Sequence, residues 1–452
     1  MLNFSIIKNV VFQLFLYISK EPSVKERIAV VSGERSPFVK AGTVFKDVAA
    51  DDLGASVLRE HLLRSQLSND SIDEVVLGCV GQPSNAANIA RVVALKAGLS
   101  ESIPAYTVAR NCASGMEALS TASNQLLADG ADIIVAGGTE SMSNYPLLFS
   151  KRMTGFFEKM MRAKTLGAKL STLASFRLSF LKPRISLIDG LTDPICGQIM
   201  GITAENLARE FQITREEQDA FALHSHQLAI AAWENGRLAE EVVAVASTDK
   251  KIDIISTDNG PRADQSLEAL AKLRPYFDRV NGTVTVGNAC PITDGAVMMT
   301  LVTESYAKKH KLKVMGYISG YEYAGLEPHR MGLGPVYAAH KLMKKQGLKT
   351  SDFDLVEINE AFAAQVIANL RAFESKAFAK EFLNEDAALG AINPDIVNVN
   401  GGAIAIGHPV GATGARLVLT QLLELKRRKL KRGLASLCIG GGLGGAFHLE
   451  VA

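Results

Sequence analysis

The chain has 452 residues, more than one ordinary hydrophobic core can organise, so two or three domains are expected. Hydrophobic residues make up 47% and charged residues 21%, and 38 glycines accompany a single tryptophan, which is typical of a glycine-rich globular α/β protein. The formal net charge of +2 excludes a global electrostatic attraction to nucleic acid, so any basic surface must be local.

The cysteines and histidines exclude two further classes. Five widely spaced cysteines without a C-x-x-C pair argue against a disulfide framework and against a zinc site, and no histidine pattern suits a metal. We therefore expect no bound metal and a reducing compartment, which means the cytoplasm of a bacterium or the mitochondrial matrix of a eukaryote.

Residues 1–26 are predicted to be an N-terminal extension outside the domains. Their apolar run at 10–18 is well short of the roughly 20 residues of a membrane span. No small-residue cleavage site follows the run, and the arginines of a mitochondrial presequence are missing.

Residues 27–144 alternate between strand and helix patterns. Such alternation predicts helices packed on a mostly parallel sheet. The expected strands are 28–31, 74–78, 104–108 and 133–136, and the expected helices are 53–65, 86–97 and 116–127.

Residues 145–280 break this alternation and are predicted to form a loop domain that returns to the first domain. Between 151 and 184 nine basic residues face a single acid, Glu158, and apolar residues interleave with them. This pattern predicts a basic amphipathic helical pair, which suits either a membrane surface or partner, or a solvated cover over the core. Helices follow at 203–211 and 215–235, the second with a capping signal of Thr214 and Glu217.

Residues 281–452 resume the alternation and form the second domain. Two segments have the same order of features at similar spacing. One runs from Ser114-Gly115 through a helix and a strand to Gly137-Gly138, and the other runs from Thr413-Gly414 through a helix and a strand to Gly440-Gly441. This repeat indicates a duplicated βα domain whose strand-end loops converge on a site between the copies.

Cys112 stands just before the predicted helix of the first copy. The unpaired N–H groups and the positive end of a helix dipole favour a thiolate there, although most isolated cysteines are small buried hydrophobes. His408, in a glycine-rich loop, is a candidate base for this nucleophile. Cys438, at a strand end, is a candidate for proton transfer at carbon, and Asn359 for hydrogen bonding to an oxyanion.

These residues lie in four motifs that together resemble the thiolase family. Asn111 to Ala118 resembles its nucleophile motif, and Asn359 to Phe362 resembles its N-E-A-F motif. Asn400 to Pro409, followed by Gly411 to Gly414, resembles its G-H-P-x-G-x-[ST]-G block, and Cys438 to Gly442 resembles C-x-G-G-G. The resemblance runs from about Ile28 to Ala452 in the order of the family.

The resemblance implies a fold of duplicated βαβαβ domains in five α-β-α-β-α layers, with an inserted loop domain. It implies CoA-dependent cleavage of 3-oxoacyl-CoA in fatty acid β-oxidation, without a permanently bound cofactor. Cys112 would attack the 3-keto carbon, His408 would take its proton, and Cys438 would protonate the acetyl-CoA enolate and later deprotonate CoA. Asn359, through a water, and His408 would bind the thioester oxygen, and the backbone N–H groups of Cys112 and Gly440 would form a second oxyanion hole.

The basic insertion resembles that of trifunctional-enzyme β subunits and bacterial fatty-oxidation thiolases. This resemblance implies a homodimer or homotetramer, a hydratase/dehydrogenase α subunit as candidate partner, and membrane contact through 151–184. Asn359 departs from the histidine usual in those β subunits. Cys290 aligns with a serine that usually touches CoA, and a thiol is a poorer hydrogen-bonding partner.

We expect a degradative thiolase that favours medium or long chains. The nearest alternative is an acetoacetyl-CoA thiolase of short-chain or biosynthetic type, which uses the same residues. Cys438 and the N-E-A-F motif argue against a decarboxylating ketoacyl synthase. The alternative from another class is a non-catalytic subunit for membrane docking or assembly.

Overall fold

The computed structural model describes residues 26–65, 67–128, 130–247 and 253–451. The predicted extension at 1–26 lies outside the described residues apart from Glu26.

A single large sheet forms the frame of the molecule, in the order β12-β13-β14-β11-β1-β10-β5-β3-β4, with β2 beside β10. The strands of its first half are β1 (Ile28–Arg35), β2 (Val39–Lys40), β3 (Glu74–Gly78), β4 (Ala105–Val108), β5 (Ile133–Ser141) and β10 (Thr293–Thr303). Those of its second half are β11 (Gly316–Gly325), β12 (Leu355–Ile358), β13 (Arg432–Ile439) and β14 (Leu443–Glu450). The two halves join where β1 and β11 pair, with Ile28 opposite Ile318.

The mostly parallel sheet predicted for residues 27–144 is right for β3, β4 and β5, whereas β1 lies antiparallel to both of its neighbours, β10 and β11. The parallel pairs are β3 with β4, β3 with β5, and β12 with β13. β10 returns after the loop domain to lie antiparallel between β1 and β5, and the tight connection between β13 and β14 forces an antiparallel pair. β10 thus lies in the sheet of the first half, although the sequence places it in the domain 281–452; the domain limits themselves stay predictions.

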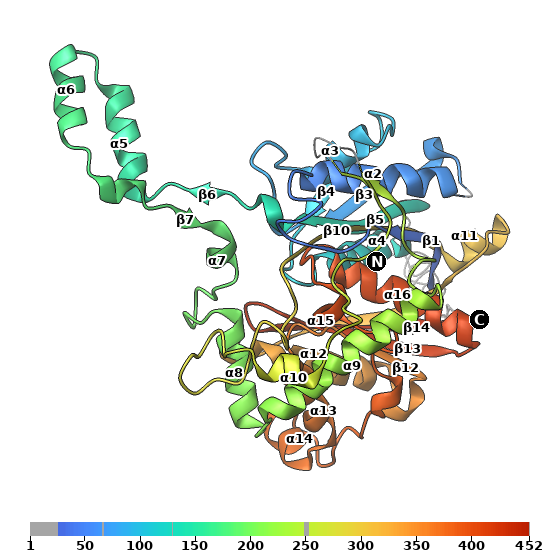
Figure 1. The fold of residues 1–452 in the computed structure, drawn as a ribbon. Helices are drawn as coiled ribbons and strands as arrows, with labels where there is room; N and C mark the ends of the chain where they lie inside the picture. Colours follow the sequence, from blue (N-terminus) through green and yellow to red (C-terminus); the bar gives the residue numbers. More distant parts are fainter. Residues whose placement is uncertain (1–25, 66, 129, 248–252, 452) are drawn as a thin grey trace, which may run out of the picture.

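Helices cover both faces of each half of the sheet (Figure 1). α2 (Ala50–Arg64) and α3 (Ile89–Lys96) cover the outer face of the first half, and α12 (Gly334–Gln346) and α13 (Ala363–Glu374) lie on the outer side of the second half. α4 (Ser114–Leu127) and α16 (Thr413–Arg428) lie against each other between the halves. The layers therefore follow the predicted α-β-α-β-α order.

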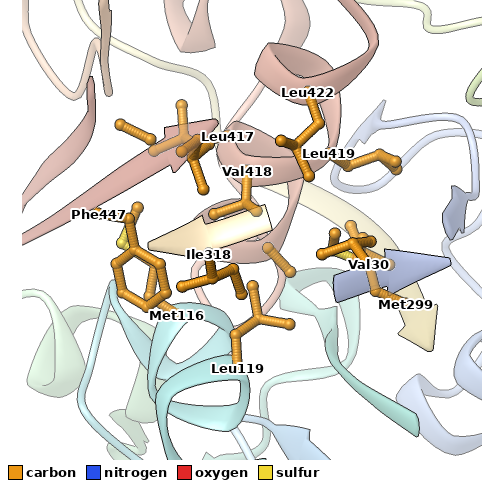
Figure 2. Packing of buried hydrophobic residues seen from close by; sticks show 14 of the residues in the cluster. Val30, Met116, Leu119, Met299, Ile318, Leu417, Val418, Leu419, Leu422 and Phe447 are labelled. Carbon is orange, nitrogen blue, oxygen red and sulfur yellow. The ribbon is translucent and has the colours of Figure 1, made fainter. Parts of the chain in front are cut away.

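Alternation along the strands explains these layers, because successive side chains of a strand point to opposite faces. In β3, Val75 and Leu77 belong to the outer hydrophobic cluster, which lies between the sheet and the helices α2 and α3. Val76 belongs to the central hydrophobic cluster, which lies between the sheet and the helices α4 and α16. In the central cluster Met116 and Leu119 of α4 pack with Val418 of α16 (Figure 2).

The repeat predicted from Ser114-Gly115 and Thr413-Gly414 is visible where the two central helices begin. A Cβ at Gly115 would lie 2.8 Å from the backbone N of Ala415, and a Cβ at Gly414 would lie 2.6 Å from the backbone N of Met116. Glycine at both positions allows the first turns of α4 and α16 to touch, which places the loops that precede them side by side.

The loop domain carries an arm that projects from the body (Figure 1). The arm, residues 147–185, consists of the two-stranded ribbon β6 (Leu147–Leu148) and β7 (Arg184–Ile185) and the helices α5 (Lys151–Arg162) and α6 (Leu166–Ala174). The predicted helical pair is confirmed. No helix in the described part of the chain is long and apolar enough to span a bilayer.

The other predicted helices of the loop domain also form. α9 begins with the predicted capping box, in which Thr214 and Glu217 each bond the backbone of the other. The further helices and strands of the loop domain are α7 (Ser186–Gly190), α8 (Met200–Glu210), α9 (Arg215–Glu234), β8 (Val245–Ala246), β9 (Ile254–Ile255) and α10 (Leu267–Ala271). Outside the loop domain, the further α-helices are α11 (Glu304–Lys309), α14 (Lys376–Phe382) and α15 (Ala403–Ile406).

Candidate active site

Cys112 lies in a tight turn between β4 and α4. The Ser114 hydroxyl donates to the carbonyl of Asn111 (2.7 Å) and accepts from the backbone N–H of Arg110 (2.9 Å), so the turn folds back on the start of the helix. Asn111 has a φ of +44°, a left-handed conformation that asparagine tolerates better than most residues. The turn presents Cys112 ahead of the first turn of α4, as predicted.

The loop after β13 closes over Cys112 from the second half. The side-chain amide of Asn111 donates to the carbonyl of Gly440 (2.7 Å), which ties the two loops together. The backbone N–H groups of Cys112 and Gly440 both lie close enough to the Cys112 sulfur to lower the pKa of its thiol. These are the two N–H groups predicted to form an oxyanion hole.

Burial raises the pKa of the Cys112 thiol, and the nearby Glu140 carboxylate adds to this rise. The two backbone N–H groups act in the opposite direction but do not outweigh the burial. The expectation that the helix terminus favours a thiolate at Cys112 is therefore wrong. In the structure, desolvation raises the pKa of the thiol by more than the backbone N–H groups lower it. Cys112 rests as a thiol and needs a base.

His408 has a free basic nitrogen. Its Nδ1 lies 2.7 Å from the hydroxyl of Thr413, and this hydroxyl donates its only proton to the carbonyl of Pro409 (2.9 Å). Nδ1 must therefore carry the imidazole proton, which leaves the lone pair on Nε2. Nε2 is buried and lacks a hydrogen-bonding partner among the described residues.

Electrostatics keep this imidazole neutral. Burial, with a smaller contribution from the charge of Arg416, lowers the pKa of His408 to about 3. A neutral imidazole with an accessible lone pair is the protonation state that a general base requires.

Two further cysteines lie close enough to Cys112 to respond to its ionisation. Burial raises the pKa of Cys438 and of Cys290, the latter to about 12, and a thiolate at Cys112 would add to the rise in both cases. Cys438 is near the end of β13, and the backbone N–H of Cys290 donates to the carbonyl of Ala361 in the N-E-A-F segment (3.0 Å). Both thiols are held in the protonated form, which suits Cys438 as a proton donor.

Asn359 directly follows β12, beside the end of the parallel strand β13. Its backbone N–H donates to the carbonyl of Ser436 (2.9 Å), two residues before Cys438. Its side chain is fully buried, yet neither the amide nitrogen nor the amide oxygen has a partner within the described residues. Because buried amides are almost always paired, these atoms indicate a place for a water or a substrate atom.

Glu360 holds this segment in position. Its carboxylate accepts from the Ser225 hydroxyl (2.6 Å), from the Asn398 amide (2.9 Å) and from the backbone N–H of Ile404 (3.2 Å). These bonds connect the N-E-A-F segment to the loop that leads to His408.

Glu140, at the end of β5, plays the same role in the first half and was missed in the sequence. It accepts from the backbone N–H groups of Val80 (3.0 Å), Gly81 (2.8 Å) and Gly411 (2.9 Å), and from the Tyr145 hydroxyl (3.0 Å). It is fully buried, and burial raises the pKa of its carboxyl. The signal that could have found it is an acidic residue inside an otherwise apolar or small-residue strand.

A cavity of about 210 Å³ ends on Cys112. Gly440, Gly441 and Val410, which is two residues after His408, line it from the second half. Apolar side chains make up most of the remaining wall: Val80, Met142, Leu187, Leu191, Ile195 and Met200. A mostly apolar cavity that leads to a nucleophile suits an acyl chain.

The structure thus brings Cys112 and Gly440 together at one cavity, with Cys438 and Cys290 in electrostatic contact with Cys112. His408 lies on the loop that supplies Val410, and Asn359 lies at the end of the strand beside β13. No cluster of three potential metal ligands occurs among the described residues.

The comparisons with known proteins agree with the resemblance seen in the motifs. The family model of the thiolase N-terminal domain matches residues 28–305, and that of the thiolase C-terminal domain matches residues 312–451. The 3-ketoacyl-CoA thiolase of Pseudoalteromonas translucida is 40% identical over 428 residues, which cover 94% of this chain and 97% of the relative.

Solved structures give the same result. The acetyl-CoA acetyltransferase of Bacillus anthracis matches with a TM-score of 0.83 and 37% identity over 94% of this chain and 99% of that one. Human mitochondrial 3-ketoacyl-CoA thiolase in complex with CoA matches with a TM-score of 0.81 and 34% identity over 94% of this chain and 98% of that one.

Proposed function

Since this chain belongs to the thiolase family of acyltransferases, we propose that it is a 3-ketoacyl-CoA thiolase of fatty acid β-oxidation. The observation that carries this proposal is the mostly apolar cavity that Cys112 and Gly440 line together, with the N–H group of Gly440 near enough to lower the pKa of the Cys112 thiol. The enzyme cleaves a 3-oxoacyl-CoA with CoA, and the products are acetyl-CoA and an acyl-CoA shortened by two carbons.

The first half-reaction forms an acyl-enzyme. His408 Nε2 takes the Cys112 proton as the sulfur attacks the 3-keto carbon, and the N–H groups of Cys112 and Gly440 stabilise the oxyanion. The bond between C2 and C3 then breaks, and the electron pair becomes the enolate of acetyl-CoA. Asn359, through a water, and His408 bind the thioester oxygen, and Cys438 gives its proton to C2.

The second half-reaction returns the acyl group to CoA. The Cys438 thiolate takes the proton of the incoming CoA thiol, whose sulfur attacks the acyl carbon on Cys112. The bond to Cys112 breaks, and the proton held by His408 returns to the Cys112 sulfur. CoA acts here as a substrate, and Cys290 contacts it. No permanently bound cofactor takes part in this scheme.

The test is cleavage of 3-oxohexadecanoyl-CoA and of acetoacetyl-CoA in the presence of CoA by the wild type and by Cys112→Ala. We expect the wild type to cleave the long substrate and the variant to lose at least 10⁴-fold in kcat, because it lacks the nucleophile. Cys196→Ala is the matched control, because Cys196 does not line the cavity, and its activity should stay near that of the wild type.

Two other outcomes would change the proposal. Cleavage of acetoacetyl-CoA alone would indicate the short-chain type, which the likeness to the Bacillus anthracis acetyl-CoA acetyltransferase favours. Activity with neither substrate would contradict the thiolase assignment of this chain on its own and would favour the docking or assembly subunit.

We also propose that the arm binds anionic lipid surfaces. Aromatic contacts hold the arm together, such as Phe156 against Phe176 with ring centroids 5.4 Å apart. Large apolar side chains remain exposed, among them Met161 (87%) and Leu178 (80%), beside the nine basic residues of 151–184. Each basic residue near an anionic surface adds about 1 kcal/mol of attraction, and the exposed apolar side chains insert into the boundary between the lipid headgroups and the acyl chains.

Cosedimentation with vesicles tests this contact. We expect binding to phosphatidylglycerol vesicles, weak binding to phosphatidylcholine vesicles, and loss of binding in Lys159→Glu/Lys169→Glu. The control Lys309→Glu/Lys311→Glu changes two exposed lysines on α11 and just after it, away from the arm (Figure 1). Binding to neither vesicle would contradict lipid contact and would favour the hydratase/dehydrogenase α subunit as the partner of the arm.

We further propose that the chain forms a homodimer or a homotetramer. β4 is the last strand of the sheet, and among the described strands it pairs only with β3. Such an open edge is a ready site for pairing with a second copy. Light scattering coupled to gel filtration should give twice or four times the mass of the chain, and the mass of a single chain would contradict the proposal.

A further inference from the structure

Tyr145 lies where the arm joins the active site. It lines the cavity together with Cys112 and stands two residues before β6, the first strand of the arm. Leu187, Leu191 and Ile195, which follow the second strand of the arm, line the same cavity. Both ends of the arm therefore lead into cavity wall.

The ring of Tyr145 is interlocked with Gly81. A Cβ at Gly81 would lie 1.9 Å from Cε1 and 2.3 Å from Cζ of this ring, well inside any allowed contact. Gly81 has no left-handed backbone conformation, so the need for glycine comes from the ring alone. The space that a side chain at position 81 would fill is occupied by the ring.

The hydroxyl of Tyr145 is anchored as well. It donates to Glu140 Oε1 (3.0 Å), and the same carboxylate accepts from the backbone N–H groups of Val80 and Gly81. The ring is thus held at one end by a buried carboxylate and along one face by Gly81, and it cannot move away from the cavity.

We propose that Tyr145, seated on Gly81 and anchored to Glu140, is the specificity-determining residue that limits the size of the acyl group held on Cys112. This inference rests on the proposed thiolase function. The ring of Tyr145 forms part of the wall of the cavity of about 210 Å³ that Cys112 also lines, so it takes up space that an acyl group on Cys112 would otherwise fill. Removal of the ring enlarges this space, whereas a side chain at position 81 pushes the ring into it.

The test is the ratio of kcat/KM for 3-oxohexadecanoyl-CoA to kcat/KM for acetoacetyl-CoA. We expect Tyr145→Ala to raise this ratio at least tenfold and Gly81→Ala to lower it at least tenfold. In the double variant Gly81→Ala/Tyr145→Ala the ratio should return to that of Tyr145→Ala, because the displaced ring is gone. Tyr145→Phe keeps the ring and should change the ratio much less than Tyr145→Ala.

Three results would overturn the inference. One is an unchanged ratio in Tyr145→Ala and Gly81→Ala when the wild type is active. Another is a Gly81→Ala effect that persists in the double variant. The third is an equal loss with both substrates in variants that melt like the wild type, which indicates a merely structural role. Inactivity of the wild type with every substrate would instead contradict the proposed function itself.

Discussion

The two halves of the molecule share one fold but treat their buried polar groups differently. At the strand ends of the first half, Glu140 accepts five hydrogen bonds, one of them from the Cys79 thiol, and is satisfied. The second half has its own satisfied carboxylate in Glu360, yet both amide atoms of Asn359, after β12, and Nε2 of His408, after α15, are buried without partners among the described residues. Because unpaired buried groups are costly, these atoms of the candidate site indicate where a substrate completes the hydrogen bonding.

This contrast suggests a division of labour. The first half supplies the nucleophile Cys112, the rigid connections through Glu140 and much of the apolar cavity. The second half supplies the groups that we assign to proton transfer and to oxygen binding, which are His408, Cys438 and Asn359. Substitution of the connecting residue Glu140 should therefore lower mainly stability, whereas substitution of Asn359 should lower mainly activity.

The largest effect on stability should come from Glu140→Ala. It removes a buried carboxylate and leaves three backbone N–H groups unpaired, so we expect the free energy of unfolding to fall by about 3–5 kcal/mol. Urea denaturation measures this change. A loss below about 1 kcal/mol would show that the bonds to Glu140 do not hold these loops together.

The matching substitution in the second half is Asn359→Ala, which should act on activity alone. No protein hydrogen bond of the side chain is lost, so the free energy of unfolding in urea should fall far less than in Glu140→Ala. The rate kcat should fall about 10²–10³-fold, as for the loss of one oxyanion donor. A large loss of stability with normal activity would contradict the role that we assign to Asn359.

The sequence predicted much of this arrangement, because motifs and periodicity are local signals. β3 has the predicted bounds, 74–78, and the capping box of Thr214 and Glu217 forms as expected. The turn at Cys112 also follows from residues next to one another in the chain, because Ser114 bonds the backbone of Arg110 and Asn111.

What the sequence did not predict depends on contacts between distant segments. The direction of β10 depends on its partners β1 and β5, and the raised pKa of Cys112 depends on how deeply the loop at Gly440 buries it. Glu140 reaches its role only by meeting loops at 80–81, 145 and 411. These contacts between distant segments leave no local pattern in the amino-acid sequence.

The pH dependence of stability sharpens the comparison further. The pKa of His408 is lowered to about 3 in the folded chain from about 6.5 when unfolded, so the unfolded state binds more protons between these values. Protonation of His408 in the unfolded state therefore lowers the free energy of unfolding as pH falls through that window, by about 3 kcal/mol at pH 4. In His408→Gln this cost is absent, so urea denaturation should show the variant gaining on the wild type between pH 6.5 and pH 4. A constant difference across this range would mean that the imidazole is not held neutral.

The smallest effect should come from Thr413, which acts on the substrate only through His408. Its hydroxyl accepts a hydrogen bond from the Nδ1–H of His408 and donates one to the carbonyl of Pro409. This arrangement keeps the lone pair of the imidazole on Nε2. In Thr413→Val the tautomer and the ring orientation lose that support, so we expect kcat to fall about 10–100-fold with little change in KM, whereas Thr413→Ser should keep most of the activity. Valine has nearly the shape of threonine, so packing at the start of α16 is retained, and a thermal melt serves as the control for folding. If serine reduced kcat and valine did not, the methyl group rather than the hydroxyl would matter, and the second half would position its base by packing, as the first half positions Tyr145 on Gly81.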